Sequence, residues 1–283
     1  MNDIDLCYNL NRNRGNNMLI NMLIFFVFGV IMGSIFCKIG FRLPLKKNLF
    51  TPSVCNSCEQ ELKFNEKIPI LSFIAQRGRC NYCGQKISMI YPLFEFGTGI
   101  LYVLTYLAFK DFYNANLTIA FGLAFVSSLL LIMITDIKYM LIPNKLVLLA
   151  SFVTITLKIV LGIRNEELKS FMDVGYELII MAIDAIIMFL LMYIVKKLGE
   201  LIFRKDALGG GDVKMMAFVA AILGYKLSIV IVFFASFIAL PISIITAYRK
   251  NNAILPFGPY LAAAALFLFL KNISFESLLE LIK

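Results

Sequence analysis

The sequence predicts an all-α membrane protein that crosses the bilayer about eight times. Of its 283 residues, 60% are hydrophobic and 16% are charged, whereas soluble domains are about 45–50% apolar and about 25% charged. The mean hydropathy is +0.83. Long apolar runs recur along the chain, and a spanning helix needs about 20 apolar residues. The runs cover residues 18–37, 93–109, 117–135, 141–162, 174–195, 213–224, 227–247 and 254–270.

These runs divide the chain into four expected parts. Residues 1–17 form a polar, Asn-rich tail, 18–37 the first transmembrane helix, 38–92 a polar loop domain with four cysteines, and 93–283 a core of seven membrane helices. We expect no cleavable signal peptide, because the first run is long for the apolar part of one and no small-residue cleavage site follows it.

The distribution of Lys and Arg predicts the orientation in the membrane. With eight spans, 18 of the 27 basic residues fall on the side of loop 38–92 and 9 on the other. Basic loops face the cytoplasm, so we expect this loop in the cytoplasm and both termini outside. The net charge of +9 then indicates contact with anionic lipid headgroups and no nucleic-acid partner.

The run 213–224 is short for a spanning helix. Twelve residues rise about 18 Å, against a hydrocarbon core of about 30 Å. The Gly-rich stretch Leu208–Lys214 before it must then enter the membrane zone, where irregular backbone is tolerated only inside protein or beside a water-filled cavity. We therefore expect Asp212 in a cavity, although an ordinary helix cap is the plainer explanation of one aspartate after glycines.

A second aspartate belongs at the same membrane depth. Asp136 ends the third apolar run and Asp212 opens the sixth, so both lie on the cytoplasmic side, and Pro143 favours a new helix shortly after Asp136. Two carboxylates that share a site hold one proton between them. One can then deprotonate water while the other protonates a scissile carbonyl, which is peptide hydrolysis. The chain has no histidine, and the sequence leaves open which aspartate is the base.

At these motifs the chain resembles the type IV prepilin peptidases, a family of membrane aspartic proteases. The resemblance rests on Asp136 with Pro143-Asn144, and on Gly209-Gly210-Gly211-Asp212-Val213-Lys214. Many members have Asp at the position of Asn144. Further matches are Gly33-Ser34, Phe41-Arg42-Leu43-Pro44, Ile68-Pro69-Ile70-Leu71-Ser72-Phe73, Arg77-Gly78-Arg79-Cys80, Tyr91-Pro92-Leu93-Phe94-Glu95 and Pro256-Phe257-Gly258-Pro259-Tyr260.

The resemblance implies a function for the membrane core 93–283. Members cleave a short basic leader from prepilin-like proteins that carry an apolar N-terminal helix, at the cytoplasmic face of the inner membrane. Asp136 and Asp212 would be the catalytic residues. Many members also N-methylate the new N-terminus with S-adenosylmethionine, so that cofactor is implied as well.

Two C-x-x-C pairs in loop 38–92 predict a metal site. Twenty-one residues separate the pairs, and four thiolates in this pattern suit a tetrahedral structural Zn²⁺. Four free thiols or a redox pair are the alternatives. Disulfides are disfavoured in the cytoplasm, and Cys37 in the first run is expected to be a small apolar residue. The expected ligands are Cys55, Cys58, Cys80 and Cys83.

Other acidic residues fall within or near the apolar runs. Glu177 and Asp184 are seven residues apart and hence share a helix face, where they could line a substrate groove or pair with Lys158. A structural, hydrogen-bonded role is the alternative. Glu95 lies near the cytoplasmic interface, where it could meet a basic leader. Asp206, in a basic stretch before Asp212, is expected to be dispensable.

Other functions stay open at this point. A proton-coupled transporter could use the same two aspartates to carry protons, but transporters usually show internal repeats, and the halves of this chain do not match. Another G-x-G-D protease, such as an archaeal-type preflagellin peptidase, would not explain the C-x-x-C loop. A membrane scaffold built on that loop would leave Asp212 unexplained.

Overall fold

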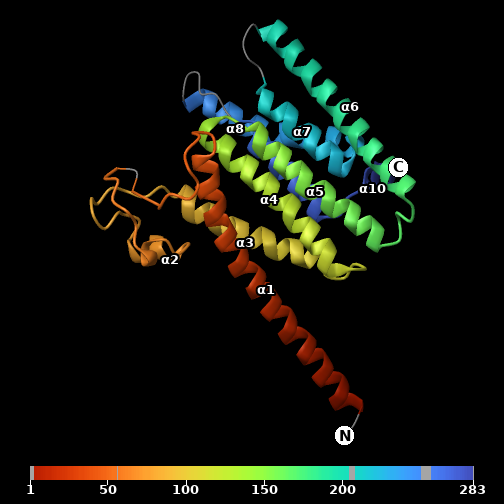
Figure 1. Cartoon of the computed structure of the whole chain (residues 1–283), viewed down its shortest axis with the longest axis horizontal. Helices are drawn as coiled ribbons and strands as arrows, with labels where there is room; N and C mark the ends of the chain where they lie inside the picture. The colour runs from red at the N-terminus through yellow and green to blue at the C-terminus, as the bar shows by residue number, and fades with distance from the viewer. Residues whose placement is uncertain (1–2, 56, 204–207, 250–255, 283) are drawn as a thin grey trace. The chain divides into compact units, whose positions relative to one another are not determined.

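The computed structural model describes residues 3–55, 57–203, 208–249 and 256–282, and none of these residues forms a strand (Figure 1). The chain forms two compact units. The first contains Met1–Lys38 and Asn48–Leu107, and the second contains Ile39–Lys47 and Ala108–Lys283.

Each of the eight apolar runs corresponds to a helix over most of its length, which confirms the all-α membrane fold. Six helices among the described residues are long and apolar enough to cross a membrane, and the spanning part of the first is Asn17–Arg42. Two apolar helices are shorter, α7 (Gly210–Leu223) and α9 (Gly258–Leu270). The six long helices are α1 (Asp3–Arg42), α3 (Ile90–Phe109), α4 (Ala115–Tyr139), α5 (Asn144–Arg164), α6 (Phe171–Phe203) and α8 (Tyr225–Arg249).

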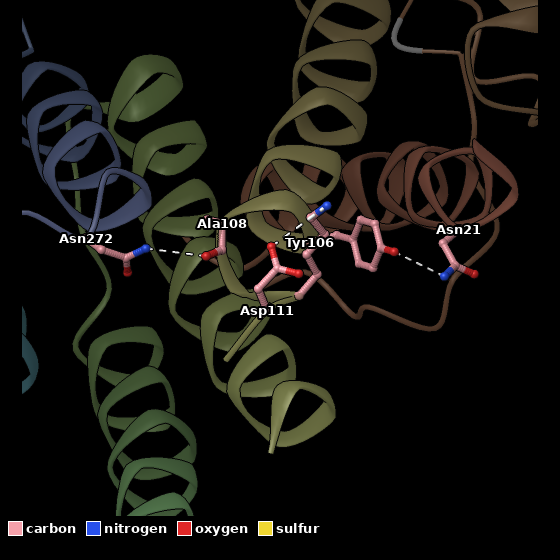
Figure 2. Close-up of polar contacts among 6 residues, drawn as sticks. Asn21, Tyr106, Ala108, Asp111 and Asn272 are labelled. Carbon is pink, nitrogen blue, oxygen red and sulfur yellow. Dashed lines mark hydrogen bonds and ion pairs between the residues drawn. The ribbon is translucent and has the colours of Figure 1, made fainter. Parts of the chain in front are cut away.

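Glycines let α1 and α3 approach closely within the first unit. A Cβ added to Gly29 would lie 2.8 Å from Gly99 Cα, and one added to Gly33 would lie 2.9 Å from Glu95 Cα. Small residues at such crossings are the usual way for membrane helices to pack. Farther along the same helices, the Asn21 side-chain amide donates a hydrogen bond of 3.1 Å to the Tyr106 hydroxyl (Figure 2).

The polar loop of the first unit contains a short 3-10 helix, η1 (Phe64–Glu66), and one short α-helix, α2 (Leu71–Ala75). Its chain is tied to α3 by Glu95, whose Oε2 accepts a hydrogen bond of 2.7 Å from the Ile70 N–H. Glu95 is only 6% exposed. A buried carboxylate needs such partners, and this contact inside the first unit explains why the residue is acidic.

The second unit is organised around α4 and α7. Helix α4 contacts α5 and α9, while α7 contacts α5, α6, α8 and α9. The Phe125 ring, fully buried on α4, lies 5.7 Å from the Phe218 ring of α7 and 4.7 Å from the Phe269 ring of α9. The end of α9 is also held by Asn272, whose amide donates 3.4 Å to the Ala108 carbonyl (Figure 2). The two short helices therefore lie inside this bundle.

Candidate active site and metal site

Asp136 lies in the last turn of α4. The helix ends at Tyr139, and Met140 follows in the left-handed conformation with φ 50°. The Met140 N–H donates 2.8 Å to the Asp136 carbonyl oxygen. Pro143, with φ −65°, stands directly before α5, which begins at Asn144. Residues 140–143 thus connect the two helices. Because α4 ends at Tyr139, Asp136 lies in its last turn.

Asp212 lies in the first turn of α7. Gly209 is the N-cap of that helix, and its carbonyl accepts a hydrogen bond of 3.2 Å from the Asp212 N–H. Asp212 is 5% exposed and Asp136 is 6% exposed. Both aspartates are therefore buried, although each stands at a helix end.

The two carboxylates meet at Gly258, the first residue of α9. The Gly258 N–H donates 3.1 Å to Asp136 Oδ2. A Cβ added to Gly258 would lie 2.6 Å from Asp136 Oδ2 and 3.2 Å from Asp212 Oδ1. Both side chains thus point at the same spot, and only a residue without a side chain leaves room for them. The two aspartates that the sequence singled out are brought together by α4, α7 and α9.

Two contacts join the start of α7 to the connection between α4 and α5. A Cβ added to Gly211 would lie 2.9 Å from Ile142 Cβ, so the first turn of α7 packs tightly on that connection. The Lys214 ammonium donates a hydrogen bond of 2.7 Å to Asn144 Oδ1. Asn144 is therefore a neutral hydrogen-bond acceptor for Lys214. An aspartate at this position would form an ion pair with Lys214 instead.

A pair of buried carboxylates this close is suited to acid–base chemistry. Two negative charges in one poorly hydrated site repel each other, so the pair carries a single proton that either member can hold. The protonated member can donate while the other accepts. From the sequence, Gly258 is recognisable only as part of a family motif, and its N–H donor is not predicted. The one available signal was its place before Pro259, which is typical of a helix start.

The four cysteines of the loop come together as the sequence predicted. All four Sγ atoms lie within 4.8 Å of one another, and Cys55 Sγ is 3.8 Å from Cys83 Sγ. A tetrahedral ion with metal–sulfur bonds of about 2.3 Å places its ligands about 3.8 Å apart, whereas a disulfide needs about 2.05 Å. The four thiols are therefore positioned to bind a metal ion.

Both cysteine pairs use the same turn. In the first, the Cys55 N–H bonds the Gln60 carbonyl, and in the second the Cys80 N–H bonds the Gln85 carbonyl. Each turn has one residue with positive φ, Glu59 and Gly84. The Ser57 and Cys58 N–H groups point at Cys55 Sγ and lower the pKa of that thiol to about 6, whereas desolvation and the neighbouring thiols raise the pKa of Cys58 to about 11. Backbone donors aimed at sulfur favour the thiolate that a metal binds.

The remaining acidic residues of interest lie away from the two aspartates. The Glu177 carboxylate lies 3.3 Å from Lys158 Nζ, which is the pairing that the sequence suggested. Asp184 lies beside Gly224, at the end of α7 opposite Asp212. Asp206 lies outside the described residues.

Several characterised proteins are similar over most of the chain. A prepilin leader peptidase/N-methyltransferase of Bacillus subtilis (strain 168) is 31% identical over 252 residues, which cover 87% of this chain and 93% of that protein. Proteins of the same name from Dichelobacter nodosus and Pseudomonas putida are 31% and 26% identical, covering 79% and 84% of this chain and 72% and 86% of their own lengths. No solved structure matches the chain.

Two family models match consecutive parts of the sequence. Residues 27–109 match the bacterial peptidase A24 N-terminal domain, which includes the cysteine loop. Residues 123–244 match the type IV leader peptidase family, and this part contains both Asp136 and Asp212. Together with the relatives that share the arrangement along nearly their whole length, these matches show that the chain belongs to the type IV leader peptidase family.

Proposed function

We propose that this protein is a membrane aspartic endopeptidase that removes the short basic leader from type IV prepilin-like proteins, with Asp136 and Asp212 as its catalytic pair. The observation that carries the proposal is the convergence of both carboxylates on Gly258, from helices far apart in the sequence. The names of the relatives supply the substrate class.

The reaction follows from two carboxylates that share a proton. The ionised aspartate takes a proton from a water molecule, and that water attacks the scissile carbonyl carbon. The protonated aspartate gives its proton to the carbonyl oxygen, so the developing negative charge is neutralised. As the tetrahedral intermediate collapses, the aspartate that took the proton from water gives it to the leaving nitrogen and the C–N bond breaks. The other aspartate takes back the proton from a hydroxyl of the intermediate, so the carboxyl product forms and the pair again holds one proton. The Gly258 N–H holds the Asp136 carboxylate in place throughout.

The relatives' names include a second activity, N-methylation, and we propose that this protein also methylates the new N-terminus with S-adenosylmethionine. A site for that donor needs hydrogen-bond acceptors for its ribose hydroxyls and its amino group. The cavity of about 300 Å³ between α5, α6 and α7 offers no carboxylate, and neither does the cavity beside Asn114 and Arg164. Neither cavity fits the donor, so we derive no step through it.

We propose that the metal held by the four cysteines is zinc, in a structural role. Four thiolates complete a tetrahedral shell and leave no open position for water or substrate. Closing such a site links the two turns across the 21 residues between them. The ion would therefore hold the loop folded and take no part in peptide hydrolysis.

We further propose that this is a multi-pass protein of the inner membrane, with both the cysteine loop and the two aspartates on the cytoplasmic side. The bias of Lys and Arg toward that side supports this orientation. The basic loop would lie against anionic lipid headgroups, and the apolar helix of the prepilin would reach the site from within the bilayer. Nucleic acid is not a partner in this proposal.

The test is leader cleavage of a full-length prepilin by purified protein in lipid. Asp136→Asn and Asp212→Asn should each lower the cleavage rate by at least about 10³-fold, because an amide keeps the shape of the side chain but cannot transfer the proton. Residues that act as one unit lose function together, so the double variant should be little worse than either single one.

Asp111→Asn is the matched control, because Asp111 has an 86% exposed side chain that forms an ion pair of 3.9 Å with Lys110. It should cleave at the unchanged rate. Rapid cleavage by either Asp136→Asn or Asp212→Asn would refute the assignment and favour the transporter alternative instead.

A further inference from the structure

We propose that Lys158, Glu177 and Asp184 form a polar clamp at the C-terminal end of α7 that fixes the depth of this helix in the membrane and thereby positions Asp212. The inference rests on the proposed function in one respect, namely that Asp212 is catalytic. None of the three residues takes part in the mechanism above, so they are positioning residues.

Helix α7 needs such a clamp because it is too short to cross the membrane. Its 14 residues rise about 21 Å, while the hydrocarbon core is about 30 Å thick. With Asp212 at the cytoplasmic side, the turn at Gly224 between α7 and α8 falls inside the membrane zone. The last carbonyls of α7 and the first N–H groups of α8 have no partners within their own helices, and in lipid the protein must supply them.

Some of these backbone groups find hydrogen-bond partners within the turn itself. The Gly224 N–H donates 2.8 Å to the Ala220 carbonyl, and the Gly224 carbonyl accepts bonds from the Ser228 N–H at 3.2 Å and the Ser228 hydroxyl at 2.8 Å. These bonds close the turn. The Ile222 carbonyl and the Tyr225 N–H are among the helix-end groups that these bonds do not satisfy.

Charged side chains from two neighbouring helices lie beside both groups. Lys158 on α5 donates from Nζ to the Ile222 carbonyl at 3.2 Å. The Asp184 carboxylate on α6 faces the Tyr225 N–H and lies beside Gly224, where an added Cβ would be 3.8 Å from Asp184 Oδ2. A cation at a helix C-terminus and an anion at a helix N-terminus are also the charges that the two helix dipoles favour. The turn between α7 and α8 therefore has the basic Lys158 at the end of α7 and the acidic Asp184 at the start of α8.

The charges in this cluster compensate one another. Lys158 Nζ lies 3.3 Å from Glu177 Oε1, and Asp184 interacts with both Lys158 and Lys226. Lys226 also lies over the Phe275 ring at 5.8 Å. Ionised side chains within a membrane are costly unless they are paired, so the Lys158–Glu177 ion pair with Asp184 beside the same turn indicates a specific role.

The clamp reaches the active site through α7 itself. The flanks of α7 are apolar, with Met215, Met216 and Val219 fully buried, and apolar contacts of this kind tolerate small sliding. Directional bonds resist sliding, both the Lys214–Asn144 hydrogen bond near Asp212 and the bonds of the clamp at the C-terminal end. A shift of α7 by one residue moves Asp212 about 1.5 Å along the axis, and a misplacement of about 1 Å can cost about 10²-fold in rate.

The first test replaces Lys158. Lys158→Met should lower kcat for leader cleavage about 10- to 100-fold with KM changed less than about twofold, because the prepilin still binds while Asp212 is misplaced. Lys158→Arg keeps the charge and the donors and should restore kcat to within about threefold. Lys169→Met, at an exposed position in the connection between α5 and α6, is the control and should leave kcat unchanged.

A second variant separates the clamp from simple charge pairing. Lys158→Met with Glu177→Leu removes both partners of the ion pair and leaves no unpaired charge, so it should fold even where the single variant does not. The Ile222 carbonyl still loses its donor, so kcat should stay low. Full activity in this double variant would overturn the proposal, since the ion pair would then be the whole role of Lys158.

Hydrogen exchange of the backbone amides of residues 210–216 provides a readout that does not depend on cleavage. Exchange should be faster in Lys158→Met and unchanged in Lys169→Met and Lys158→Arg. Unchanged exchange together with unchanged kcat in Lys158→Met would overturn the clamp. If Asp212→Asn remained active, the proposed function would fail, yet the exchange measurement would still decide whether Lys158 holds α7.

Discussion

Gly258 is the point at which the geometry of the aspartate pair is most sensitive to a single atom. Its N–H bonds Asp136 Oδ2, and an added Cβ would lie 2.6 Å from that same oxygen. Real Cβ atoms do not approach this closely, so the carboxylate would have to move. The residue therefore both orients one aspartate and limits the space between the two.

We expect Gly258→Ala to lower the cleavage rate about 10²-fold, because a displaced carboxylate is a misplaced acid or base. The protein should remain folded and inserted in the membrane. Gly175→Ala is the matched control, since Gly175 lies in α6 with nothing within 4 Å of an added Cβ. It should leave the rate unchanged. Equal rates for the two variants would show that the space at Gly258 is not critical.

At the scale of single residues, the sequence predicts the two aspartates of the site but not the role of Gly258 beside them. Asp136 and Asp212 stand out because each is an acid at the end of an apolar run. The role of Gly258 depends on where α9 packs against α4 and α7, and no local pattern contains that information. The contact of Lys158 with the Ile222 carbonyl depends in the same way on the packing of α5 against α7.

The connection from α4 to α5 shows strain at the scale of an element. Met140 occupies the left-handed conformation with φ 50°, where helices usually place Gly. Its N–H nevertheless bonds the Asp136 carbonyl, so the turn keeps the Asp136 end of α4 closed. The backbone at this position stores strain of about 1 kcal/mol.

A matched set of substitutions tests that strain. Met140→Gly should be more stable than Met140→Ala by about 1 kcal/mol, because both lose the side chain but only glycine relieves the left-handed backbone. At Leu149, an exposed position within α5, the order should reverse, with Ala more stable than Gly by about 1 kcal/mol. Thermal unfolding in detergent gives the comparison. The same order at both positions would rule out strain at Met140.

The cysteine loop is the other element whose stability can be tested directly. Purified protein should contain about one Zn²⁺ per chain, and Cys58→Ser should lower both the metal content and the amount of folded protein, because metal binding and folding are coupled. Cys37→Ser is the control, since Cys37 is buried in α1 outside the loop, and it should keep its zinc. Active protein free of zinc would refute a structural zinc site.

Most of the helices could be predicted because each contains a long apolar run, but their ends could not. Helix α6 continues to Phe203, beyond the apolar run that ends at residue 195. Its polar extension is stabilised by Glu200, which lies 3.7 Å from Lys196 Nζ and 2.7 Å from Lys197 Nζ. Pairs at these spacings favour helix in water. Helix α10 (Phe275–Ile282) is too short to register as an apolar run.

For the whole molecule, the distribution of Lys and Arg supports the proposed orientation. Eighteen of 27 Lys and Arg residues fall on the side of the cysteine loop, and the positive side of a membrane protein faces the cytoplasm. In the proposed topology the end of α4 and the start of α7 belong to that side as well. A leader that stays in the cytoplasm before cleavage would then meet the aspartates without crossing the bilayer.

An epitope tag inserted after Phe50, which is 93% exposed in the cysteine loop, tests this orientation. If the loop lies in the cytoplasm as proposed, an antibody or protease added outside intact cells should not reach the tag, and it should do so after permeabilisation. A tag inserted after Tyr113, 75% exposed between α3 and α4, is the matched control and should be reached without permeabilisation. The reverse pattern would place the loop outside. It would also put Asp136 and Asp212 on the wrong side for a cytoplasmic leader, so the orientation and the proposed substrate would fail together.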